Sequence, residues 1–418
     1  MRALLSLLVI VASLGRASAL RSLPVRALSA RPAALRARRT AFPRASPHRS
    51  ARLPASAMSS AAAGAGQPEG AKPDQGPITQ DPLELCDGED VEEACTLPGG
   101  VTVPMSWVRT ARIGACFAVW FALNIMYNIS NKVCQNAFPM PWTMATVSLA
   151  VGVPYVLLLW ATGLRKAPKV NPGGWNKLVP IGLFHALGHA SAVIALGAGA
   201  VSFTHIIKAA EPVFTCVLSY LVLGQTFSLP VYLSLIPIVG GVALASLKEL
   251  SFTWKALIGA MMSNIAFASR AIYSKRQMTT PVGENLGAAN LYGLLTIIAL
   301  VATVPVALWF EGPLFQAEWA KVCASHGAGW MIQQMLMNGV YFYSYNEVAF
   351  YTLSQVAPVT HAVGNTLKRV AIIATSVIVF KNPLSQLSII GSTIAILGAL
   401  LYSLAKAKEK TSTSAAAA

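Results

Sequence analysis

Long apolar segments alternate with short polar stretches through most of the chain. We expect helices near residues 110–131, 140–163, 176–197, 201–223, 229–247, 255–275, 289–310, 329–353, 357–380 and 386–405. A helix needs about 20 residues to cross a bilayer, and these segments are close to that length. Lipid offers no hydrogen-bond partner to a free backbone group, so the crossing segments must be helical. The pattern therefore predicts an all-α membrane protein with about ten transmembrane helices.

The two halves of this apolar region resemble each other. Thr-His occurs at 204–205 and again at 360–361, and the sequence GVALAS at 241–246 resembles GALLYS at 398–403. The distance along the chain between the two copies is nearly the same in both cases. A repeat of five helices crosses the membrane an odd number of times, so its second copy has the opposite orientation. We expect two inverted five-helix repeats, from which many transporters build a site near the midplane of the membrane.

These repeats occupy residues 108–247 and 248–406, and a C-terminal tail follows at 407–418. The preceding segment, 53–107, is rich first in Ala, Gly and Ser and then in Pro and acidic residues. Such a composition buries too little apolar surface to fold by itself. We therefore expect residues 53–107 to be a disordered linker.

The N-terminus has the composition of a targeting leader. Residues 1–19 contain an early Arg, a short apolar run and the small residues Ala17-Ser18-Ala19, which are typical of a signal peptide. Residues 20–52 are rich in Arg, Ala and Ser and lack acidic residues, which is typical of a transit peptide. This order resembles the two-part leaders of algae with secondary plastids, which are reached through the secretory pathway. The alternative is a secreted or endomembrane protein with an Arg-rich tail.

Charge is distributed unevenly between this leader and the rest of the chain. The formal net charge is +16, but eleven Arg residues lie in residues 1–52, so the remainder is only mildly basic. Charged residues make up 11% of the chain, against about 25% in soluble domains. We see no basic face that would indicate nucleic acid. The six Cys residues and the HxxxH pair at 185 and 189 lack the spacing of a metal site, and no catalytic set is evident, so we expect no metal, cofactor or enzyme activity.

Four cationic residues lie inside the predicted helices, namely Lys208, Arg270, Lys368 and Arg369. A Lys or Arg at the centre of a transmembrane helix costs about 2.5–3.5 kcal/mol. Acidic residues are scarce in these segments, and the clear ones are Glu211 and Glu347. The excess of positive charge therefore predicts an anionic ligand. Phosphate fits this prediction, because Arg binds it with two parallel hydrogen bonds and Lys binds it as a point charge.

Several motifs resemble those of the plastid phosphate translocators of the drug/metabolite transporter superfamily. They are His185–His189, Ser202–Pro212, Ser263-Asn264, Arg270–Lys275, Glu311–Pro313, Tyr345-Asn346 and Thr360–Arg369. The resemblance implies a ten-helix carrier that exchanges a phosphorylated metabolite for inorganic phosphate. By the family's pattern, the phosphate is bound by Lys208, Lys368 and Arg369, and the rest of the substrate contacts His189, Arg270 and Tyr345.

The type of substrate follows from two of these residues. His189 and Tyr345 resemble the triose-phosphate type, which implies an antiporter of triose phosphate and 3-phosphoglycerate in a plastid envelope membrane. Ala192 replaces a hydroxyl residue of that type, and the sequence at 232–238 looks more like the glucose-6-phosphate type. The alternatives are therefore a glucose-6-phosphate or phosphoenolpyruvate antiporter, or a nucleotide-sugar transporter of the same superfamily. The expected partners are the phosphorylated substrate, inorganic phosphate and the lipid bilayer, and we expect a monomer to suffice.

Overall fold

The computed structural model describes residues 94–96, 102–247, 249–277, 282–356 and 358–417. The expected signal peptide at 1–19 and transit peptide at 20–52 lie outside the described residues. So does most of the expected linker, whose described residues form two short paired strands and the start of a helix.

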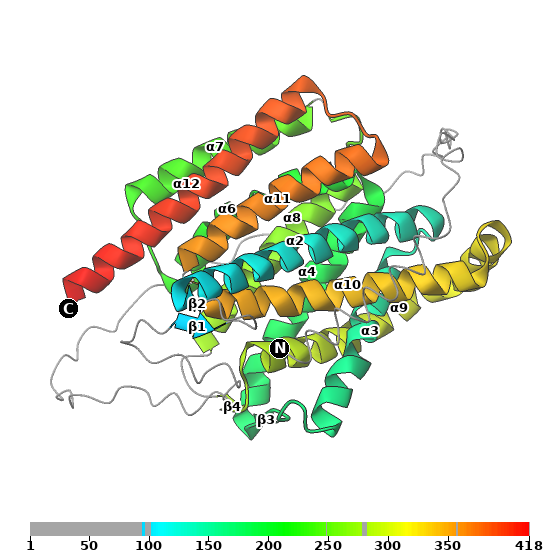
Figure 1. Ribbon diagram of the computed structural model, residues 1–418. Helices are drawn as coiled ribbons and strands as arrows, with labels where there is room; N and C mark the ends of the chain where they lie inside the picture. The colour runs from blue at the N-terminus through cyan, green and yellow to red at the C-terminus, as the bar shows by residue number, and fades with distance from the viewer. Residues whose placement is uncertain (1–93, 97–101, 248, 278–281, 357, 418) are drawn as a thin grey trace, which may run out of the picture. The chain divides into compact units, whose positions relative to one another are not determined.

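Helices form nearly all of the described chain (Figure 1). The helices are α2 (Met105–Ala137), α3 (Pro141–Ala161), α4 (Trp175–Ala198), α5 (Val201–Lys208), α6 (Glu211–Leu223), α7 (Leu229–Leu247), α8 (Trp254–Gln277), α9 (Ala288–Ser325), α10 (Ala328–Gln355), α11 (Pro358–Phe380) and α12 (Gln386–Ala417), with the 3₁₀ turn η3 (Pro172–Gly174). The strands are β1 (Ala94–Thr96), β2 (Thr102–Pro104), β3 (Lys169–Val170) and β4 (Gly283–Glu284). Strand β1 pairs antiparallel with β2, and β3 pairs antiparallel with β4.

Nine segments of the described chain are long and apolar enough to cross a membrane. The remaining long helix, α10, contains Gln333, Gln334, Asn338 and Glu347 and packs against α2, α3 and α9. Its neighbours therefore shield polar side chains that lipid would not tolerate. The predicted all-α membrane architecture is confirmed.

Polar side chains lie inside this helical bundle, and large apolar side chains lie outside it. Asn131, Asn264 and Asn338 are fully buried, whereas Trp309 and Ile378 are 81% and 75% exposed. A soluble protein has the opposite tendency, because Asn is usually exposed and Ile is usually buried. The outer surface therefore matches lipid, and the buried polar groups gather between the helices.

The packing of the helices repeats between the two halves of the chain. Helix α4 packs against α8 and α9, and α10, which has the equivalent place in the second half, packs against α2 and α3. Equivalent helices also meet each other directly, as in the pairs α3 with α9, α5 with α11 and α7 with α12. A contact between a helix of the first half and one of the second half therefore recurs between the two equivalent helices. Two related five-helix repeats are expected to give this pattern.

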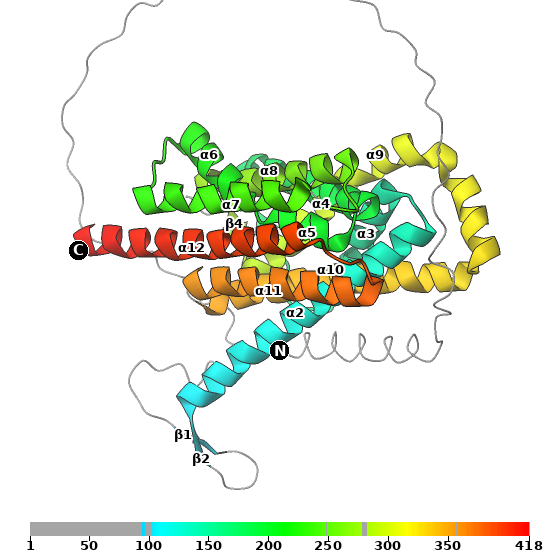
Figure 2. The same ribbon diagram turned by 90° about the horizontal axis from the view of Figure 1, so that it is seen from above.

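Three elements differ from the expected spans. Helix α12 continues to Ala417, through most of the expected C-terminal tail at 407–418. The fourth span consists of two helices, α5 and α6, which are separated at Ala209-Ala210. Pro212 lies in the first turn of α6. Backbone N–H groups in this turn have no acceptor within the helix, so a proline, which lacks the N–H, is tolerated there. The seventh span does not end near residue 310, because α9 continues to Ser325. Pro305 and Pro313 lie within α9, and Figure 2 shows the helix turning along its course toward α10, as interior prolines favour.

Helices α7 and α12 approach each other through small residues and lie side by side in both views (Figures 1 and 2). A Cβ atom added at Gly241 would lie 2.4 Å from the backbone nitrogen of Ala395 and 2.6 Å from the carbonyl oxygen of Gly391. A Cβ atom added at Gly391 would meet Ala245 and Gly241 at the same distances. Helices in lipid often associate through close backbone contacts of this kind, because the hydrophobic effect does not drive apolar helices together there.

A buried carboxylate fastens α9 to the beginning of α3. The oxygens of Glu311 accept hydrogen bonds from the backbone N–H groups of Trp142 and Thr143 at 2.9 and 2.7 Å. The first N–H groups of a helix lack intrahelical partners, and the N-terminal end of its dipole attracts negative charge. Glu311 therefore has a structural role, because it supplies from α9 the hydrogen-bond acceptors that the first N–H groups of α3 lack.

A second carboxylate joins α10 to the segment that follows α3. Glu347 forms a salt bridge with Arg165, and the side chains are 5% and 20% exposed. A buried charge left without its partner is strongly destabilising. The pair therefore links the two segments only while both charges are present.

Substitution of Gly241 by Ala is expected to lower the melting temperature of the detergent-solubilised protein. The added methyl group has no space against α12, and overpacking costs about 1–3 kcal/mol. Gly240 is the matched control, because a Cβ atom there has nothing within 4 Å. Gly240→Ala should leave the melting temperature unchanged or raise it, and an equal loss in both variants would contradict the packing described.

Glu347→Gln is expected to destabilise the protein by about 2 kcal/mol, less than for a fully buried pair because Arg165 is partly exposed. The double variant Arg165→Met/Glu347→Leu should recover part of this loss, because it leaves no uncompensated charge. Thermal unfolding of the single variants Arg165→Met and Glu347→Leu and of the double variant measures the coupling between the two side chains. Additive losses would show that the two side chains do not stabilise each other.

Candidate functional site

The break between α5 and α6 places two opposite charges at two helix ends. Lys208 is the last residue of α5, and Glu211 is the first residue of α6. The C-terminal end of a helix favours a cation and the N-terminal end favours an anion. Both charges are therefore stabilised by the backbone itself, inside a segment that crosses the membrane.

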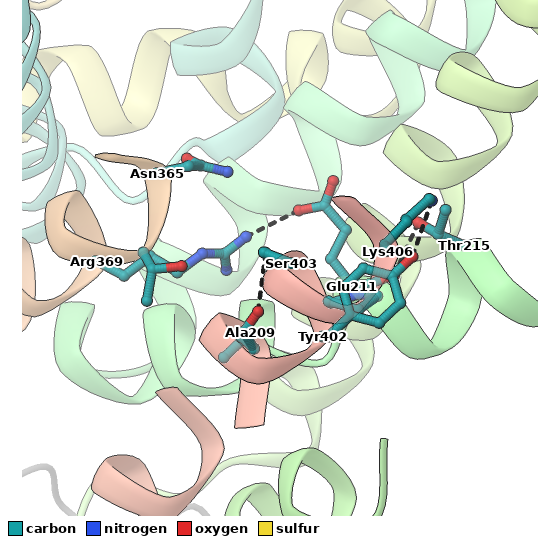
Figure 3. A pocket seen from close by; sticks show the side chains of 11 residues that line it. Ala209, Glu211, Thr215, Asn365, Arg369, Tyr402, Ser403 and Lys406 are labelled. Atoms are coloured by element: carbon teal, nitrogen blue, oxygen red, sulfur yellow. Dashed lines mark hydrogen bonds and ion pairs between the residues drawn. The ribbon is translucent and has the colours of Figure 1, made fainter. Parts of the chain in front are cut away.

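Helix α11 supplies the adjacent residues Lys368 and Arg369 near its middle. Arg369 Nη2 donates a hydrogen bond to Glu211 Oε2 at 2.9 Å, and Lys368 Nζ lies 4.6 Å from the centre of the Trp120 ring. Figure 3 shows the Arg369–Glu211 pair within a cavity of about 190 Å³. The cavity lies between α6, α11 and α12, and Asn365, Tyr402 and Lys406 also line it.

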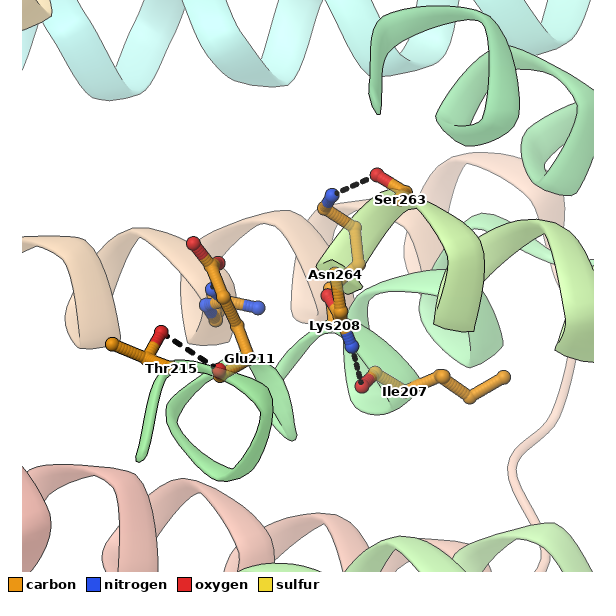
Figure 4. Close-up of polar contacts among 7 residues, drawn as sticks. Ile207, Lys208, Glu211, Thr215, Ser263 and Asn264 are labelled. Atoms are coloured by element: carbon orange, nitrogen blue, oxygen red, sulfur yellow. Dashed lines mark hydrogen bonds and ion pairs between the residues drawn. The ribbon is translucent and has the colours of Figure 1, made fainter. Parts of the chain in front are cut away.

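One face of α8 contacts the first half of the chain. Lys208 Nζ donates a hydrogen bond to Ser263 Oγ at 2.8 Å, and Asn264 Nδ2 donates one to the backbone carbonyl of Ile207 at 2.9 Å (Figure 4). One turn further along α8, the Phe267 ring lies between two cations. Its centre is 4.7 Å from Lys208 Nζ and 5.1 Å from Arg270 Cζ. Helix α8 thus orients cations from both halves with a hydroxyl and an aromatic ring, neither of which cancels positive charge.

His189 and Tyr345 lie on α4 and α10, around a group of aromatic rings. His189 Nε2 is 3.2 Å from the backbone carbonyl of Ala145, and because a carbonyl only accepts, this nitrogen carries the hydrogen. Both residues contact Phe342, at centroid distances of 4.1 Å for His189 and 5.7 Å for Tyr345. Arg270 links this region to the cations, because its Nη1 lies 2.8 Å from Nδ1 of His185, one turn before His189 on α4.

Four cations share a single carboxylate among the described residues. Glu211 interacts electrostatically with Lys208, Arg270, Lys368 and Arg369. Three positive charges therefore remain without a counter-charge in the interior of the bundle. Glu211 thus interacts with all four nominated cations, whereas the nominated His189 and Tyr345 lie beside Phe342 on α4 and α10. The surplus of positive charge around Glu211 suits an anion.

Several contacts of the site were not assigned from the sequence. Ser263, Phe267 and Arg270 follow the spacing of one helix face, a signal that would have placed Ser263 and Phe267 beside the cations. Trp120 gave no such signal, because it lies on a helix remote in the sequence. His185 belonged to a recognised pair with His189, and its Nδ1 lies 2.8 Å from Arg270 Nη1.

Comparison with known proteins identifies the family of this chain. Residues 111–403 match the model of the Triose-phosphate Transporter family. The chain is 42% identical over 299 residues to glucose-6-phosphate/phosphate translocator 2, chloroplastic, of Arabidopsis thaliana, which covers 71% of this chain and 75% of the relative. It is 42% identical over 334 residues to the triose phosphate/phosphate translocator, chloroplastic, of Flaveria trinervia, covering 79% and 80% of the two chains. The corresponding Zea mays protein is 43% identical over 296 residues, or 71% of each chain. With the match extending over most of the chain, this protein belongs to the triose-phosphate transporter family.

Proposed function

We propose that this protein is an antiporter that exchanges a phosphorylated metabolite for inorganic phosphate. The observation that carries the proposal is the cluster of four half-buried cations around one carboxylate. In this proposal Lys208, Lys368 and Arg369 bind the phosphate group, which both substrates share. The chain belongs to a family of transporters, and we propose that it moves its substrate chemically unchanged.

Obligatory exchange follows from the same charge surplus. A bound phosphate would neutralise most of the three uncompensated charges. Without it, a change of orientation would seal bare cations in a low-dielectric interior, at a cost of several kcal/mol per ion. The empty carrier should therefore rest open on one side, and the loaded carrier should reorient by rocking of the two repeats.

For the rest of the substrate, we propose that His189, Arg270 and Tyr345 contact a three-carbon chain, as in triose phosphate or 3-phosphoglycerate. The relatives named triose phosphate/phosphate translocators support this choice. Glucose 6-phosphate is the second candidate, because relatives named for it are as similar to this chain as those named for triose phosphate.

The proposed location is a plastid envelope membrane, which the chain crosses several times. The chloroplast names of the relatives support it. The Arg-rich composition of residues 20–52 is typical of import into such an organelle. Because residues from both halves surround the cations within one chain, a monomer should be sufficient for transport.

Exchange in liposomes tests the function directly. Labelled phosphate should enter vesicles that are preloaded with phosphate, triose phosphate or 3-phosphoglycerate, and should not enter empty vesicles. Glucose 6-phosphate and phosphoenolpyruvate in parallel vesicles measure the preference. Equal uptake into empty vesicles would show a channel, and uptake driven by none of the organic phosphates would refute the antiporter.

Lys368→Ala is expected to abolish exchange, because it removes a cation of the proposed phosphate site. Arg369→Lys should reduce it at least about tenfold, since Lys lacks the planar fork that can bind phosphate with two parallel hydrogen bonds. Lys255→Ala is the matched control, because Lys255 is exposed at the start of α8. Initial rates at equal amounts of reconstituted protein provide the comparison, and normal exchange by Lys368→Ala would exclude this residue from the mechanism.

A further inference from the structure

His185 is a buried polar residue to which the proposed exchange assigns no role. It lies on α4 one turn before His189 and is 2% exposed. Its ring packs edge-on against Tyr292, with centroids 5.9 Å apart, and lies 6.3 Å from Phe267. Burying an imidazole among aromatic rings requires a compensating hydrogen bond.

That hydrogen bond determines the protonation state of the ring. Arg270 Nη1 lies 2.8 Å from His185 Nδ1, and a guanidinium can only donate. His185 Nδ1 must therefore accept, which makes the ring neutral and places its hydrogen on Nε2. No described residue accepts a hydrogen bond from this Nε2.

A neutral acceptor has one consequence that a carboxylate would not have. An Asp or Glu at position 185 would also orient Arg270, but it would cancel the positive charge. His185 holds the guanidinium and leaves its charge available. Arg270 then differs from Arg369, whose charge is already paired with Glu211 at 2.9 Å.

The location of Arg270 shows what this orientation controls. It interacts electrostatically with Glu211 of the cation cluster, and its hydrogen-bond partner His185 packs against Tyr292 on the aromatic side. An Arg side chain is long and flexible, so without a second anchor it would be drawn toward the carboxylate of Glu211. The bond to His185 holds it back on the aromatic side.

Helix α4 is also shaped to keep this arrangement. A Cβ atom added at Gly188 would lie 2.8 Å from the Phe267 ring, so the glycine leaves the space that the ring occupies. That ring in turn lies 5.1 Å from the Arg270 guanidinium. Arg270 is therefore held on one side by the nitrogen of His185 and on another by the face of Phe267.

We propose that His185 is the positioning residue that directs Arg270 to the organic part of the substrate, and thereby determines how well an organic phosphate is bound relative to phosphate alone. This proposal rests on the proposed antiport. Inorganic phosphate has no organic part, so its binding should depend little on His185. Triose phosphate and 3-phosphoglycerate carry further oxygen atoms, which a correctly placed guanidinium can bind.

The test compares three substitutions that differ in where they place an acceptor. In His185→Asn, the amide oxygen can occupy the place of Nδ1 and accept from Arg270. In His185→Gln, a similar polar group extends beyond that place, and in His185→Leu no acceptor remains. His326→Leu at the exposed end of α9 is the matched control for loss of a histidine.

Each variant is reconstituted into liposomes, and KM and the maximal rate are measured for uptake of phosphate and of the organic phosphate that the wild type prefers. For His185→Leu we expect the KM of the organic phosphate to rise about tenfold or more, since a hydrogen bond to a charged group is lost. The KM and maximal rate of phosphate–phosphate exchange should stay within about twofold. His185→Asn should restore most of the organic KM, His185→Gln should restore less, and His326→Leu should match the wild type.

Equal loss of both exchanges in His185→Leu would indicate a merely structural role and overturn the proposal. An unchanged ratio of the two KM values would overturn it as well. If His185→Leu does not fold, His185→Asn and His185→Gln still decide the question. Both side chains carry an amide oxygen, but only that of Asn can lie in the place of Nδ1, so equal behaviour of these two variants refutes the proposal. A wild type that exchanges phosphate but no organic phosphate would instead refute the proposed function itself.

Discussion

Positive charge held inside a membrane-spanning bundle is the constraint on which the site depends. Four cations share the carboxylate of Glu211, and three of them are stabilised further by groups that carry no charge. Lys208 ends a helix and contacts the Ser263 hydroxyl, and Lys368 lies against Trp120. Arg270 lies against Phe267 and bonds a neutral histidine. Hydroxyl groups, aromatic faces and helix ends lower the cost of the cations without neutralising them, so the charge remains available to an anion.

The other carboxylates of the described helices are already engaged, which preserves this surplus. Glu311 accepts two backbone hydrogen bonds at the start of α3, and Glu347 is paired with Arg165. Glu318 forms a salt bridge with Lys321 three residues further along α9. The acidic residues that fasten the scaffold are therefore not available to quench the site. Structural and binding charges are separated within the same bundle.

The cation cluster draws on both halves of the chain. Lys208 and Glu211 come from the first half, and Arg270, Lys368 and Arg369 come from the second half. A ligand that binds all of them joins the halves electrostatically. Helices α7 and α12 join them differently, through rigid backbone contact at Gly241 and Gly391. The chain thus combines a permanent contact between its repeats with one that depends on the ligand.

The sequence alone determined the membrane class and the number of helices within about one, and it predicted the repeat and the six residues of the site. These follow from local or nearly local properties, because hydropathy, helix length and the scarcity of acidic partners can be read along the chain. It did not determine the ends of α9 or the split between α5 and α6, which depend on how prolines are accommodated by neighbouring helices. The partners of the cations were decided only by the tertiary structure. Trp120, Glu211 and Arg369 are remote from one another in the sequence, and His185 acquires its tautomer only from the guanidinium of another helix. Contacts of this kind exist only after packing, because distance in space and not spacing along the chain sets the hydrogen bonds and charges that each group meets.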